Sequence, residues 1–145
     1  MTKWFALSVV ASAVAVLATN LVIYVLFYGD FLASNSGLSR ELFEQVQKPA
    51  DQTDILAFVV ATLLTGTLLT AVIERVKART FAAGATAAFV FGCLMVGSVD
   101  LGLIATTHYY STFSGIVDIF VAAATFAIGG GIAALILRRG AQAAA

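Results

Sequence analysis

The sequence predicts an all-α, polytopic membrane protein: a bundle of four transmembrane helices with a short helix in its long outer loop. The chain has 145 residues, of which 61% are hydrophobic and only 11% charged, a composition too apolar for an ordinary soluble domain of this length. The apolar residues gather in four runs, each long enough to cross a hydrocarbon core as a helix of about 20 residues. None of the runs alternates as the strands of a membrane barrel do, so helices are expected.

The four spans are expected at residues 4–28, 55–73, 81–107 and 113–137, within one transmembrane domain that covers residues 1–145. The first run begins like a secretory signal peptide, with Lys3 ahead of an apolar centre. It continues to Tyr28, however, which is longer than the apolar part of a signal peptide. An uncleaved first span is therefore expected.

The basic residues predict the direction of the spans, because cytoplasmic loops carry an excess of Lys and Arg. Arg40 and Lys48 fall in the long loop, at residues 29–54. The other six basic residues lie beside three ends of the predicted spans, and these ends fall on the same side of the membrane because two spans separate each from the next. The six residues are Lys3, Arg75, Lys77, Arg79, Arg138 and Arg139. Both termini are therefore expected in the cytoplasm. The long loop and the turn at residues 108–112 are expected outside, which in a Gram-negative cell means the periplasm.

The segment "LSRELFEQVQK" predicts a short helix lying on the outer face, because its apolar residues recur at helical spacing and Pro49 follows as a stop. These apolar residues are Leu38, Leu42, Phe43 and Val46. A lid over the bundle or a rest on the membrane surface is favoured over a helix that recognises a partner.

Ridges of small residues predict close packing between helices. They are Thr62, Gly66 and Thr70 on the second span, Gly84, Ala88 and Gly92 on the third, and Ala123, Ala127 and Gly131 on the fourth. One compact bundle is expected, although the same ridges can serve a homo-oligomer or a larger membrane complex. The segment "IGGGI" at residues 128–132 is expected to be a flexible point of the fourth helix.

Two acids, Asp100 and Asp118, lie inside predicted spans. Counted at 1.5 Å per residue, both lie roughly 7 to 11 Å below the outer boundary. Asn20 on the first span and Thr62 on the second reach the same level by the same count. The four side chains predict a polar site in the outer half of the bundle.

Acids within a span are costly, so Asp100 and Asp118 are expected to face the bundle interior or a water-filled pocket. If they approach one another, repulsion and desolvation favour a shared proton. The structural alternative is equally open: Asp118 can favour the positive end of a helix, and Asp100 can be a hydrogen-bonded packing residue.

The remaining polar and aromatic residues suggest little chemistry. His108 lies at the outer boundary, where it can titrate or bind a metal with the acids, although a solvated turn residue is the simpler interpretation. Trp4, Tyr28, Tyr109 and Tyr110 are expected to form interface belts. No catalytic residue, cofactor motif or metal-ligand cluster is evident, and Cys93 is expected to be a small buried hydrophobe. A local ion pair of Glu74 with Lys77 is expected.

The motifs "DLGLIAT" (residues 100–106) and "VDI" (residues 117–119), with the aromatic exit "LFYGDF" of the first span, carry a resemblance. The chain resembles a domain-of-unknown-function family of small four-helix bacterial inner-membrane proteins, over the first span and the last two. In that pattern a Trp precedes the second acidic motif and a Trp-Gly pair follows it; here Tyr110 and Val121-Ala122 take those places. The resemblance implies a four-span fold and the inner membrane, and little about activity.

Two functions from different classes remain open. The first is a binding protein, and by extension a carrier, whose outer-leaflet site takes a small ligand, an ion or a lipid through Asn20, Thr62, Asp100, Asp118 and His108. The second is an accessory or structural subunit of a larger membrane complex. An enzyme is not favoured. The lipid bilayer is the expected partner, and nucleic acid is not, because the net charge is zero and no basic run occurs.

Overall fold

The computed structural model describes residues 3–46, 48 and 52–143, and these residues form helices without any β-strand. The elements are α1 (Lys3–Ile23), the π-helical turn η1 (Tyr24–Tyr28), α2 (Gly29–Asn35), α3 (Arg40–Val46), α4 (Ile55–Arg75), α5 (Phe81–Thr106) and α6 (Thr112–Gln142). Since α1, η1 and α2 run on without a break, four helical stretches are long and apolar enough to cross a membrane. The predicted all-α fold with four candidate spans is confirmed at this level.

The outer loop differs in part from its prediction. The first helical stretch ends at Asn35 instead of Tyr28, because α2 continues it through the first residues of the expected loop. The predicted short helix is present as α3, and Phe43 is its buried residue. Leu42 and Val46 of the same segment are exposed, so only one side of α3 packs on the molecule. The predicted stop at Pro49 lies outside the described residues.

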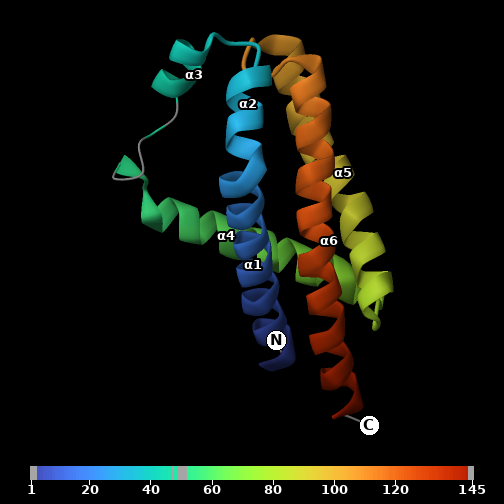
Figure 1. Ribbon diagram of the computed structural model, residues 1–145. Coiled ribbons are helices and arrows are strands. Elements are labelled where there is room, and N and C mark those ends of the chain that lie inside the picture. The colour runs from blue at the N-terminus through green and yellow to red at the C-terminus, as the bar shows by residue number, and fades with distance from the viewer. Residues whose placement is uncertain (1–2, 47, 49–51, 144–145) are drawn as a thin grey trace.

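The long helices do not form a bundle of four antiparallel neighbours. In Figure 1 the first stretch, α5 and α6 run along the long axis of the molecule, and α4 crosses them at a steep angle. The two ends of the described chain lie at the same end of the molecule in this view. The outer connection, with α3 and the turn between α5 and α6, lies at the opposite end.

The crossing of α4 depends on a close approach at Gly66. A Cβ atom at this position would lie 2.5 Å from the carbonyl oxygen of Val9 and 2.8 Å from the Cβ of Ala13, so α1 and α4 can touch here only because the residue is glycine. Contact is concentrated near this point and in the C-terminal half of α4, where all of its buried residues lie. The N-terminal half is apolar and mostly exposed, as at Ile55 and Leu56.

Buried hydroxyls hold the same crossing together. The hydroxyl of Ser12 donates to the carbonyl of Gly66 (3.2 Å), and the hydroxyls of Ser8 and Thr70 lie 3.3 Å apart. Ser8 also donates to the carbonyl of Ala133 on α6, at 3.4 Å. We call Ser8, Ser12 and Thr70 the central hydroxyl cluster. Each of its hydroxyls has a partner, and the three residues are fully buried.

Small residues bring α5 and α6 into contact, as the ridges predicted. A Cβ on Gly84 would lie 2.5 Å from the carbonyl oxygen of Gly130, and one on Gly92 would lie 2.9 Å from the Cα of Ala123. At residues 128–132, the expected flexible point, α6 is unbroken and Gly129, Gly130 and Gly131 are all buried. Close packing restrains the segment: Gly129 meets α1 and α4, while Gly130 and Gly131 meet α5.

Candidate functional site: two aspartates and two tyrosines

Asp100 and Asp118 lie at one level and act on each other. Asp100 is six residues before the end of α5 at Thr106, and Asp118 is six residues after the start of α6 at Thr112. The two carboxyls are close enough for the charge of Asp118 to act on Asp100. Asp100 is only 4% exposed, and its Oδ2 atom has no hydrogen-bond partner among the residues that the structure describes. The two helices therefore bring the acids together, as their matched depth suggested.

Two tyrosines hold the carboxylate of Asp118. The hydroxyl of Tyr28 donates to Oδ1, and the hydroxyl of Tyr110 donates to Oδ2 at 3.2 Å. Burial and the charge of Asp118 raise the pKa of the Tyr110 phenol above its ordinary value, so this hydroxyl keeps its proton and remains a donor. We call Asp100, Asp118, Tyr28 and Tyr110 the aspartate–tyrosine site.

The π-helical turn sets the position of Tyr28. The backbone N–H of Gly29 donates to the carbonyl of Tyr24, five residues earlier, which is the π-helical pattern. One extra residue in the turn changes the direction of the side chains that follow. Tyr28 consequently becomes a buried residue, 8% exposed, beside an exposed Phe27. Single π-helical turns within α-helices occur often at functional sites.

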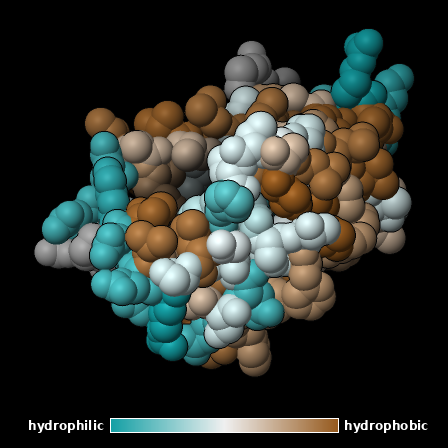
Figure 2. Space-filling view, turned by 90° about the horizontal axis from the view of Figure 1, so that it is seen from above, coloured by the Kyte–Doolittle hydropathy of each residue, from teal (hydrophilic) through white to brown (hydrophobic). Residues whose placement is uncertain are grey.

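An aromatic cap covers this site on the side of α3 and of the turn between α5 and α6. Its buried residues are Tyr28, Leu32 and Phe43, against which Phe31, Leu38, Tyr109 and Tyr110 pack. The Phe43 and Tyr109 rings stack with their centroids 6.1 Å apart, so α3 rests on the turn between α5 and α6. Figure 2 looks onto this end and shows hydrophilic side chains gathered on the side of α3. The prediction that α3 is a lid over the bundle agrees with this packing.

Backbone contacts fix the turn that carries Tyr110. The N–H of Gly37 donates to the carbonyl of Tyr109 (3.3 Å), and the hydroxyl of Ser111 donates to the carbonyl of Asn35 (2.6 Å). A Cβ on Gly37 would lie 2.3 Å from the carbonyl oxygen of His108, so this approach requires glycine. The end of the first helical stretch and the turn between α5 and α6 thus hold one another in place.

A cavity of about 400 Å³ opens beside Asp118, between the first helical stretch, α4 and α6. Its polar side chains include Asn20, Tyr28 and Asp118. Most of the remaining wall is apolar: Leu17, Leu21, Ile23, Leu32, Phe58, Val121 and Ala122. Asp118 thus places a carboxylate, already bonded to two hydroxyls, on the wall of an otherwise apolar cavity.

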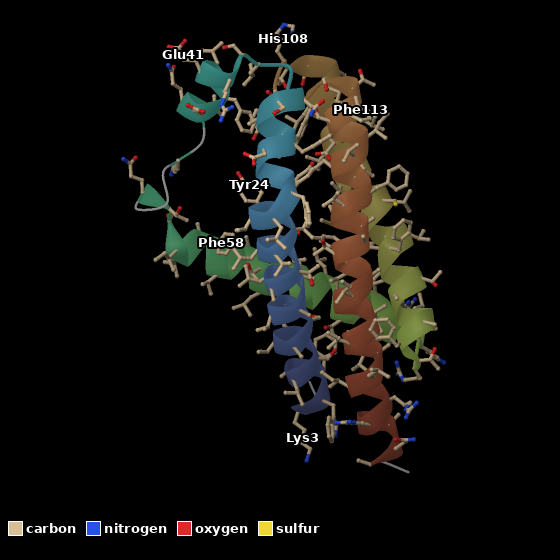
Figure 3. The ribbon with its side chains drawn as sticks, in the orientation of Figure 1. Lys3, Tyr24, Glu41, Phe58, His108 and Phe113 are labelled. Atoms are coloured by element: carbon tan, nitrogen blue, oxygen red, sulfur yellow. The ribbon has the colours of Figure 1, made fainter. Side chains whose placement is uncertain are left out.

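The structure does not bring all five predicted site residues together. Asn20 shares the cavity wall with Asp118, whereas Thr62 lines a separate pocket with Val10 and Ala13. The Thr62 hydroxyl donates to the carbonyl of Phe58 on its own helix, at 2.8 Å. His108 is exposed on the outer turn, and Figure 3 shows it at the far end of the molecule. The steep path of α4 carries Thr62 away from the level that residue counting gave it.

Tyr28 and Tyr110 are the site residues that sequence reasoning missed, because both were expected in an interface belt. One signal was available, because each tyrosine lies within one or two helical turns of an acid or a span end. A buried tyrosine hydroxyl needs a hydrogen-bond partner, and a nearby acid can supply it. No pattern in the sequence indicated the π-helical turn that points Tyr28 inward.

The arrangement can bind a cation or a hydrogen-bond donor, because the Asp118 carboxylate and the Tyr28 hydroxyl line the cavity, with Asp100 and Tyr110 beside Asp118. It offers no nucleophile activated by a base. Within the described ranges, residues 3–46, 48 and 52–143, no three His, Cys, Asp or Glu side chains group closely enough to hold a metal ion.

In comparisons with protein-family models, curated proteins and solved structures, nothing matches this chain.

Proposed function

We propose that this protein is a small integral membrane protein that binds an amphiphilic small molecule, with a positively charged head at Asp118 and an apolar body in the adjoining cavity. The observation that carries the proposal is the carboxylate of Asp118 on the wall of a cavity of about 400 Å³ that is otherwise mostly apolar. Cavities of this size, with few polar groups among many apolar ones, are typical of small-molecule sites.

The charges favour a cationic head over an anionic one. Asp118 lies beside a second acid, Asp100, whose Oδ2 atom is buried without a partner. No ion pair between a basic side chain and either acid occurs in the described part of the chain, where the ion pairs are Arg40 with Glu44 and Arg79 with Glu74. A bound ammonium group would supply the missing positive charge and would donate charge-assisted hydrogen bonds.

The cavity wall also favours an amphiphile over a bare ion. Leu21 is 61% exposed and Phe58 is 51% exposed, although both line the cavity, so its mouth is apolar at the side of the helices. In a bilayer this side faces lipid tails, and a ligand can enter laterally with its apolar body in the groove. A carrier function is a further step of the same proposal.

Binding of octylamine, octanol and octanoate to the full chain in nanodiscs tests the proposal by calorimetry. These probes share one apolar body and differ in the charge of the head. Octylamine should bind most tightly, and Asp118→Asn should weaken it at least about tenfold, as expected for losing a hydrogen bond to a charged group. Asp30→Asn, an exposed acid on α2, is the matched control and should leave binding unchanged. Equal binding of the three probes would contradict the proposal.

The placement of the chain is part of the proposal. We propose that it lies in the inner membrane with both termini in the cytoplasm, which the position of both described ends at one end of the molecule supports. Single cysteines at Gln45 and Gln142, introduced with Cys93 replaced by Ser, test this in intact cells. An impermeant thiol reagent should label position 45. Labelling of position 142 alone would reverse the orientation.

A role as an accessory subunit of a larger membrane complex is the second candidate. It is favoured by the N-terminal half of α4, where Ile55, Leu56 and Leu64 are 59% to 74% exposed. Such a face can pack against another membrane protein as well as against lipid. Migration of the protein with a larger assembly in native gels of mildly solubilised membranes would support this function. Migration at its own size would argue against it.

A further inference from the structure

The corner between α4 and α5 forms another lined groove, far from the aspartate–tyrosine site. A short turn, residues 76–80, joins the two helices, which then diverge because α4 crosses the molecule steeply (Figure 1). Between them lies a groove of about 740 Å³ with Lys77 and Arg79 among its lining residues, at the corner where the helices meet. The groove also has an apolar wall, formed by Val72, Val76, Ala83, Ala87 and Val90.

This end of the molecule is strongly basic. Six of the eight basic residues lie at the ends that meet here, against Glu74 as the one acid among the described residues there. Glu74 pairs with Arg79 at 2.9 Å, and not with Lys77 as the sequence suggested. Arg79 also donates to the carbonyl of Ala78 at 3.1 Å, so its guanidinium is held in position by Glu74 and Ala78. Lys77 forms no ion pair with any described residue.

The backbone at Lys77 is strained. Its φ angle of 54° lies in the left-handed region, directly after the C-cap of α4 at Val76. Glycine is the usual residue at this position of a helix end, because a side chain makes the conformation less favourable. A lysine held in such a conformation is an observation that points toward a role for its side chain.

We propose that this groove binds an anionic phospholipid, with the phosphate of its headgroup at Lys77 and Arg79 and an acyl chain along the apolar wall. The excess of positive charge complements the phosphate. Basic pockets between membrane helices bind anionic headgroups in this way. The apolar wall that leads away from the two basic residues accommodates the lipid tail, which a soluble phosphate would leave unused.

Native mass spectrometry of the full chain in detergent tests this binding with phosphatidylglycerol and phosphatidylcholine as probes. Phosphatidylglycerol should bind at lower concentration than phosphatidylcholine. Lys77→Gly should weaken phosphatidylglycerol binding about fivefold, the effect expected of one basic residue near an anionic lipid. Because glycine adopts the φ angle of this position freely, the variant should be at least as thermally stable as the parent, and weaker binding cannot then be ascribed to unfolding.

Arg138→Gln is the matched control, since it removes one positive charge from the same end of the molecule without touching the groove. It should leave phosphatidylglycerol binding nearly unchanged. An equal loss in the two variants would overturn the proposed groove and leave only general attraction by the basic end. Equal binding of the two lipids would overturn the headgroup selectivity. Displacement of phosphatidylglycerol by an excess of glycerol 3-phosphate would assign the site to a soluble phosphate instead.

Discussion

The central hydroxyl cluster and the aspartate–tyrosine site differ in how completely their polar atoms are bonded. In the central hydroxyl cluster, every hydroxyl of Ser8, Ser12 and Thr70 has a partner, and the three residues are fully buried. In the aspartate–tyrosine site, Oδ2 of Asp100 has no partner and Asp118 lines a cavity. The polar atoms of the first cluster are therefore all hydrogen-bonded without a ligand, whereas one buried carboxyl oxygen of the second is not.

Polar groups among apolar helices can link the helices or can bind a ligand, and the two roles suit different side chains. Neutral hydroxyls that bond to neighbouring backbone, as Ser12 does to Gly66, fasten one helix to another at small cost. Carboxyls are far more expensive to bury and are a poor choice for fastening alone. Their placement beside a cavity, under a cap of packed aromatic rings, supports the proposed binding role.

The largest expected effect is that of Asp118→Leu on stability. The change leaves the hydroxyls of Tyr28 and Tyr110 without their acceptor and removes the neighbour of Asp100, which should cost about 3 kcal/mol or more. Unfolding in mixed detergent, followed by circular dichroism, measures the loss. Asp30→Leu at an exposed site should change stability by no more than about 0.5 kcal/mol. Equal effects of the two changes would remove the distinction between this site and the surface.

Thr70→Val should have a smaller effect, and on stability alone. It removes the Thr70 hydroxyl from the central hydroxyl cluster, which should cost about 1 to 2 kcal/mol. Thr67→Val is the control, because Thr67 is exposed and its hydroxyl bonds only within its own helix, to the carbonyl of Leu63. Octylamine affinity, measured by calorimetry, should be the same in both variants. A weaker affinity in Thr70→Val would mean that the two clusters are not separate.

Tyr110→Phe should have the smallest effect of the three. It removes one hydrogen bond to Asp118 while the ring stays in the aromatic cap, and the expected loss is about 1 kcal/mol. Tyr109→Phe changes a ring of the same cap whose hydroxyl has no hydrogen bond among the described residues, so its stability should not change. A difference in midpoint temperature between the two variants measures this bond. Identical midpoints would show that the Tyr110 hydroxyl contributes nothing.

The sequence was sufficient to predict the helices and the shared level of the two acids, and insufficient for the angles between helices. Span length and the level of Asp100 and Asp118 follow from local composition and from the rise per residue. The tilt of α4 depends on the close approach at Gly66, and the rotation of Tyr28 depends on a π-helical turn. Both arise from packing between distant segments, which explains why Thr62 was placed at the site and the tyrosines were not.

A double-mutant cycle on Asp100 and Asp118 tests most directly the central claim that the two acids form one site. Unfolding free energies in detergent are needed for Asp100→Leu, Asp118→Leu and the double variant, with Thr70→Val combined with Asp118→Leu as a control cycle. The acid pair should show an interaction energy of about 0.5 kcal/mol or more, since each change removes the partner of the other. The control cycle should be additive. Additive effects of the two aspartate changes would contradict the account, because the carboxyls would then be independent.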